Sequence, residues 1–82
     1  VIRLNRAVAV GEADGPQAGL AALHPVGEHV PRYHAALAYL HERAGETDAS
    51  AGEYAEAARR ATSALEQQHL LREAERLRQA RR

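Results

Sequence analysis

Glycine and proline interrupt an otherwise helix-favouring sequence and divide the chain into short segments. The interruptions are Gly15-Pro16, residues 25–31 and Gly45. Between them alanine, leucine, arginine and glutamate dominate, while phenylalanine and tryptophan are absent from the sequence. These frequent residues favour the α-helix, and runs of β-branched residues, which favour strands, are scarce. We therefore predict an all-α fold.

Apolar residues recur at helical spacing within the segments, as expected for helices that bury one face. Tyr33, Leu37 and Leu40, for example, follow one another at intervals of four and three residues. Ser63 and Glu66 match a capping box, which marks the start of a last helix. The five predicted helices cover residues 2–13, 16–24, 31–44, 48–62 and 63–80.

The residues between the predicted helices suit tight helix–helix connections. Gly15 is placed to end the first helix, Asp14 to cap the second, and Pro16 to occupy the first turn of the second. By the same logic Pro31 is expected to open the third helix and Gly45 to end it. Short helices rich in alanine approach each other closely, so we predict stacked antiparallel helix hairpins.

The length of 82 residues suits one small domain spanning residues 1–82. Because the sequence begins at Val1 and contains no methionine, we expect it to be a fragment of a longer protein. Without cysteine neither a disulfide nor a thiolate metal site can form, and a cytoplasmic location fits. No apolar run approaches the roughly 20 residues of a membrane-spanning helix, so no membrane contact is expected.

Histidines are the most reactive side chains available, yet their spacing does not indicate chemistry. His34 and His41 lie seven residues apart on one face of the third predicted helix. A zinc-protease helix would need histidines four apart around a glutamate, which is absent. We predict instead that these two histidines line the inner surface of the hairpin stack, available to a partner. We expect no enzymatic activity, no metal site and no cofactor.

Charge is balanced overall but not locally. The formal net charge is zero, which argues against a nucleic-acid surface over the whole domain. Residues 72–82, however, hold five arginines against two glutamates. A solvated helix end, where cations suit the helix dipole, accounts for this excess. The alternative is a basic tip that contacts nucleic acid or an acidic partner.

Residues 33–65 resemble one tetratricopeptide-type unit. Leu37-Ala38 matches the large-then-small pair of its first helix, Gly45 falls at the inter-helix turn, and Tyr54 takes the aromatic site of its second helix. Residues 1–24 resemble a degenerate copy, and the last helix would then be a solvating cap. The resemblance implies two tetratricopeptide-like hairpins followed by a cap.

A second resemblance covers nearly the whole chain. Its landmarks are Leu4-Asn5-Arg6-Ala7-Val8-Ala9-Val10, Asp14-Gly15-Pro16, Ala18-Gly19-Leu20, Tyr33-His34, the hairpin turn at residues 40–45 and residues 66–71. They are similar to the helical, tetratricopeptide-like extension that follows the promoter-binding regions in one group of extracytoplasmic-function-type bacterial sigma factors. The resemblance implies a regulatory or protein-interaction domain in transcription initiation. Its partners would be the factor's own promoter-binding regions or RNA polymerase, with DNA bound through upstream regions rather than through this segment.

Under this hypothesis the candidate partner-binding residues are Arg6, Tyr33, His34, His41 and Arg43. Asn5 is interpreted structurally, as an amide that makes a buried hydrogen bond to the next helix. Two alternatives stay open: a nucleic-acid contact through the arginine-rich last helix, and a generic repeat scaffold of an unrelated protein. The isolated fragment could also dimerise through faces that normally pack on missing neighbours.

Overall fold

A computed structural model describes residues 2–80 of the chain, and those residues are helical without any strand. The elements are α1 (Ile2–Asp14), α2 (Pro16–Leu23), the 3-10 helix η1 (His24–Val26), α3 (Tyr33–Arg43), α4 (Thr47–Arg60) and α5 (Ala64–Ala80). The predicted all-α fold is confirmed. None of the helices within the described residues is both long and apolar enough to cross a membrane.

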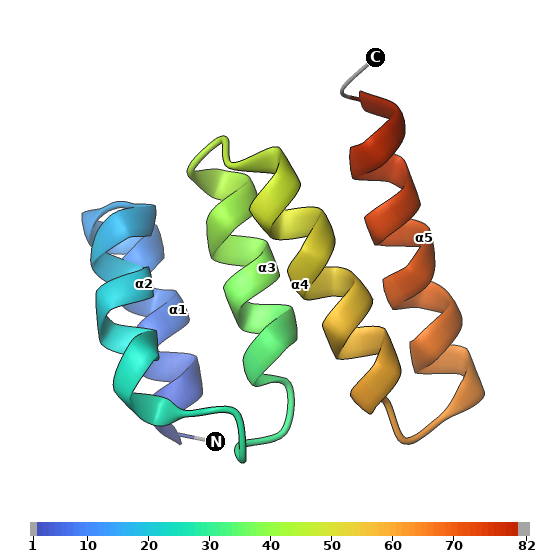
Figure 1. The fold of residues 1–82 in the computed structure, drawn as a ribbon. Helices are drawn as coiled ribbons and strands as arrows, with labels where there is room; N and C mark the ends of the chain where they lie inside the picture. The colour runs from blue at the N-terminus through green and yellow to red at the C-terminus, as the bar shows by residue number, and fades with distance from the viewer. Residues whose placement is uncertain (1, 81–82) are drawn as a thin grey trace.

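Successive helices run in opposite directions and lie side by side in an array of 30 × 28 × 15 Å (Figure 1). The α1–α2 hairpin lies at one end, the α3–α4 hairpin in the middle, and α5 packs on α4 at the other end. The chain reverses at the glycine- and proline-containing connections after α1, α2 and α3, as predicted, and again at residues 61–63, which contain neither residue type. The helices therefore form consecutive antiparallel pairs.

Some helix ends differ from the prediction. Pro31 does not open α3, because Arg32 after it adopts a left-handed backbone with φ of 70° and the helix starts only beyond it. Asp14 does not cap α2 but is the last residue of α1; the N-cap is Gly15, with φ of 101°. Residues 24–26, which fall at the end of the predicted second helix and in the loop after it, form η1.

Other helix ends follow the local sequence signals closely. Gly45 follows the end of α3 and adopts a left-handed backbone with φ of 79°. The N–H of Glu46 then donates to the carbonyl of His41 at 2.9 Å. This is the hydrogen bond of a glycine-terminated helix. The N–H of Glu66 donates to the Ser63 hydroxyl oxygen at 3.1 Å, so Ser63 caps α5 as predicted.

The core consists of two clusters that meet at α3. The first cluster comprises Leu4, Ala7, Leu23, Tyr33, Ala36 and Leu40. The second comprises Ala38, Ala51, Tyr54, Ala57, Ala58, Leu70, Ala74 and Leu77. Leu71 of α5 lies outside both clusters and is 50% exposed. Because α3 contributes to both clusters, it connects the two ends of the array.

α1 and α2 approach each other closely at two glycines. Gly11 and Gly19 are both buried, and a Cβ added to Gly19 would lie only 2.7 Å from the Gly11 Cα. Leu40 from α3 packs over the Gly11 position. The absence of side chains at these two residues thus lets the backbones of α1 and α2 touch.

Candidate functional site

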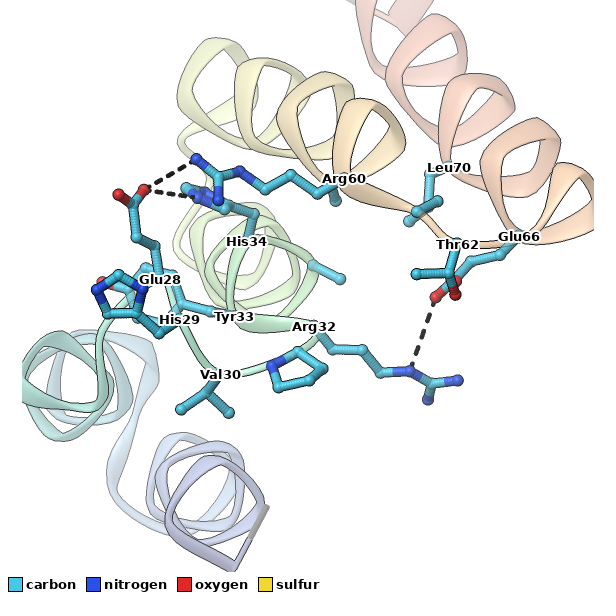
Figure 2. A pocket seen from close by; sticks show the side chains of 14 residues that line it. Glu28, His29, Val30, Arg32, Tyr33, His34, Arg60, Thr62, Glu66 and Leu70 are labelled. Atoms are coloured by element: carbon cyan, nitrogen blue, oxygen red, sulfur yellow. Dashed lines mark hydrogen bonds and ion pairs between the residues drawn. The ribbon is translucent and has the colours of Figure 1, made fainter.

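A cleft of about 360 Å³ lies where residues 27–32 face the start of α3, the end of α4 and the start of α5 (Figure 2). Ala35, Ala57, Ala61 and Leu70 supply the apolar part of its lining. Three of these are alanines, whose small side chains leave the space open. The volume lies within the range of roughly 300–1,000 Å³ that is common for ligand pockets.

Two groups of charged side chains border the cleft and tie residues 27–32 to the helices. In Figure 2 Glu28 faces Arg60 and His34: its Oε1 accepts a hydrogen bond from Arg60 Nη2 at 3.1 Å. Further along, Arg32 Nε lies 3.7 Å from Glu66 Oε2 on α5. Such partly exposed ion pairs stabilise a fold only slightly, about 0–1 kcal/mol each. Their main effect is to position the loop.

The His34 side chain is largely enclosed at the cleft, with 14% of it exposed. Its Nδ1 lies 2.6 Å from Glu53 Oε1 on α4, and its Nε2 lies 3.4 Å from Glu28 Oε1. The Tyr33 ring meets the imidazole edge-on with centroids 5.3 Å apart. Nε2 is buried and has no hydrogen-bond partner within the part of the chain that the structure describes.

Tyr33 belongs more to the core than to the surface, with 9% of its area exposed. Burial raises the pKa of its phenol, and the negative charges of Glu53 and Glu28 raise it further. The candidate residues Tyr33 and His34 therefore do meet at the cleft. Only His34, however, lies among its charged groups.

His41 and Arg43 lie at the opposite end of α3, away from the cleft. His41 Nδ1 lies 2.7 Å from Glu46 Oε1, and this hydrogen bond lowers the pKa of the Glu46 carboxyl below its ordinary value. Arg43 Nη2 lies 3.6 Å from Glu12 Oε2 on α1. The structure thus does not bring the five candidate partner-binding residues into one surface.

The exposed side of α1 carries the other candidates. Asn5 is exposed, so the buried hydrogen bond predicted for it is wrong: the turn of the helix directs Leu4 and Ala7 inward and Asn5 outward. Arg6 and Ala9 are exposed as well.

The arginines of α5 are partly neutralised. Arg76 Nη2 lies 2.9 Å from Glu42 Oε2 and 2.8 Å from Glu73 Oε1, and these bonds raise the pKa of Arg76. Arg78 Nη1 lies 4.0 Å from Glu75 Oε1. Arg81 and Arg82, also part of the predicted basic tip, lie outside the described residues.

No sequence pattern predicted Glu28, Glu53 or Arg60 as site residues. No short motif contains them, since Glu53 follows His34 by 19 residues. One signal was available: His34 and Glu53 lie on either side of the Gly45 turn, so an antiparallel register through that turn brings them close.

His34 Nε2 is buried beneath its neighbours, so a substrate has no direct access to it. Within the described residues no group of three or more histidine, cysteine or acidic side chains is arranged to hold a metal ion. Comparisons with models of protein families, with curated proteins and with solved structures found no match to the chain.

Proposed function

We propose that this chain is a protein-interaction domain of an extracytoplasmic-function-type sigma factor that regulates transcription initiation. The observation that carries the proposal is the resemblance of Asn5-Arg6-Ala7-Val8-Ala9, followed by Asp14-Gly15-Pro16, to the helical extension of those factors. The partners are the factor's own promoter-binding regions or RNA polymerase. The scaffold is two tetratricopeptide-like hairpins with α5 as a cap.

The burial pattern of α1 supports a role in binding. Ala7 is 1% exposed and packs in the first core cluster, so the fold accounts for it. Asn5, Arg6 and Ala9 are exposed, and the packing of this chain does not account for their types. Residues that a fold leaves exposed are available to a partner. We therefore assign the contact to the exposed side of α1, formed by Asn5, Arg6 and Ala9.

A promoter-reporter assay with the full-length factor tests the proposal. Deleting residues 1–82 should change promoter firing severalfold, and Asn5→Ala combined with Arg6→Glu should reproduce part of that change. Gln68→Ala, an exposed substitution on α5, is the matched control and should leave firing unaltered. If the deletion leaves promoter firing unchanged, the proposed function is wrong.

A further inference from the structure

We propose that His34 is a proton-operated clamp that holds residues 27–32 against α4. The clamp joins three elements: His34 on α3, Glu53 and Arg60 on α4, and Glu28 in the segment between η1 and α3. In its protonated form His34 attracts both carboxylates. When the proton leaves, the attraction between His34 and Glu28 is lost and residues 27–32 are held less tightly.

The hydrogen-bond donors and acceptors around the ring favour its protonated form. A neutral imidazole has one N–H donor and one acceptor nitrogen, whereas the protonated ring has two donors. The 2.6 Å contact between His34 Nδ1 and Glu53 needs Nδ1 to carry hydrogen, because the carboxylate is an acceptor. In a neutral ring Nε2 would then be an acceptor 3.4 Å from an oxygen of Glu28, also an acceptor. Nε2 would also be buried without a hydrogen-bond partner, which is unfavourable.

The protonated ring resolves both problems. The charge of the Nε2–H group, 3.4 Å from Glu28 Oε1, then interacts favourably with that carboxylate. The separation of 3.4 Å is longer than an ideal hydrogen bond, but Glu28 is 54% exposed and its side chain can move closer. Protonation therefore turns the buried nitrogen into a donor, and the Glu28 carboxylate is an acceptor within reach of it.

The surrounding charges favour the same form. The charged groups that face His34 are Glu53 and Arg60 from α4 and Glu28 from the segment before α3. The Arg60 guanidinium also binds Glu56, with Nε to Oε2 at 2.7 Å, so two carboxylates share its charge. The carboxylates outnumber the cations around the ring, and an adjacent negative potential stabilises an imidazolium.

The neighbouring Tyr33 lies in the same negative potential, since the charges of Glu53 and Glu28 both add to the increase in the pKa of its phenol. The other charged pair at the cleft, Arg32 with Glu66 of α5, neutralises itself and does not reverse the potential. His29 lines the cleft as well but is exposed, so its charge is screened by solvent.

Loss of the proton should affect the loop specifically. Glu28 keeps its hydrogen bond to Arg60, but it then faces the lone pair of the His34 nitrogen. Two backbone hydrogen bonds of the loop should open more often when it loosens. They are Val30 N–H to the Gly27 carbonyl at 3.3 Å and Tyr33 N–H to the Val30 carbonyl at 3.1 Å. Because residues 28–32 line the cleft, their release would widen it.

Nuclear magnetic resonance of the whole ¹⁵N-labelled chain tests the clamp between about pH 5 and pH 8, where histidine titrates. The ring nitrogens of His34 should both carry hydrogen at the acidic end. As the ring loses its proton, exchange of the Val30 amide, corrected for base catalysis, should accelerate about tenfold, the size expected for one charged hydrogen bond. A His34 ring that stays neutral throughout, or a loop whose exchange does not follow the ring, would overturn the proposal.

A pair of variants separates the clamp from a general effect of pH. Glu28→Gln removes the charge but keeps an amide that can donate to neutral Nε2, so the tenfold response should fall below about twofold. Glu66→Gln removes the carboxylate from the other pair at the same cleft and should retain the full response. If Glu28→Gln also retains the full response, Glu28 is not held by His34 and the proposal fails. This result is independent of the reporter assay, because no sigma factor is needed.

Discussion

Gly19 determines how closely α1 and α2 approach, because its missing side chain is where their backbones meet. A Cβ at this position would lie 2.7 Å from the Gly11 Cα and 3.1 Å from the Ala7 carbonyl oxygen. Both are backbone atoms, which cannot rotate away as a flexible side chain can. Gly19→Ala should therefore lower the free energy of unfolding by about 1–3 kcal/mol, measured by urea denaturation with circular dichroism.

Gly52 is the matched control for that substitution. It also lies within a helix, but it is exposed and a Cβ there would meet nothing within 4 Å. Gly52→Ala should raise stability by about 0.5–1 kcal/mol, because alanine has the higher helix propensity. Two glycine-to-alanine changes of opposite sign would establish that close packing, rather than helix propensity, sets the effect at Gly19. A stabilising Gly19→Ala would contradict the close contact between the helices.

Single residues were predictable from the sequence where their role is local. Ser63 was identified as a cap because its hydroxyl bonds an amide only three residues away. Asn5 was placed wrongly because burial depends on which side of α1 the neighbouring helices cover. His34 was singled out as a candidate, yet its partners Glu53 and Glu28 come from other elements. Nothing within a few residues of His34 reveals them.

At the scale of one element, the last turns of α4 are organised around Glu56. Its carboxylate accepts hydrogen bonds from Arg60 and Arg59, one helical turn away, and these lower its pKa to about 2. A carboxyl with a lowered pKa stabilises the folded state above its ordinary pKa of 4.5. That stability is lost as the pH falls from there towards about 2.

Thermal unfolding followed by circular dichroism from neutral to acidic pH measures this dependence. Glu56→Gln should be less stable than the unmodified chain at neutral pH, and the difference should shrink as the pH falls through that window. The side chain is accessible to solvent, so added salt should reduce the difference too. Glu75→Gln on α5, whose carboxylate lies 4.0 Å from Arg78, is the control and should track the unmodified chain more closely. A difference that stays constant with pH would contradict the ion pairs at Glu56.

The two ends of α3 show which helix boundaries can be predicted from the local sequence. Gly45 ends α3 as predicted, since a left-handed residue is needed there and glycine adopts that conformation at little cost. The start of α3 was misplaced because Pro31 is equally compatible with a turn. The left-handed Arg32 after it delays the helix, and its side chain reaches Glu66 of α5, a contact between distant elements.

At the scale of the whole molecule, α3 is shared between the two core clusters. Tyr33, Ala36 and Leu40 pack in the cluster with α1 and α2, whereas Ala38 packs in the cluster with α4 and α5. The sequence predicted an apolar stripe along this helix, but not that its residues divide between two neighbours. The cleft could not be predicted from the sequence either. It is formed where α3, α4 and α5 meet the loop before α3, and these segments come together only in the folded chain.

A shared central helix predicts that the two clusters unfold together. Leu40 is 1% exposed and belongs to the first cluster, so Leu40→Val, which removes one buried methylene, should cost about 1 kcal/mol. If unfolding is cooperative, the urea midpoints of amides in α2 and in α5 should fall by the same amount, although α5 does not contribute to the first cluster. Leu65→Ala, at an 80% exposed residue, is the control and should move neither midpoint appreciably. A fall confined to α2 would mean that α3 connects the clusters without coupling their unfolding.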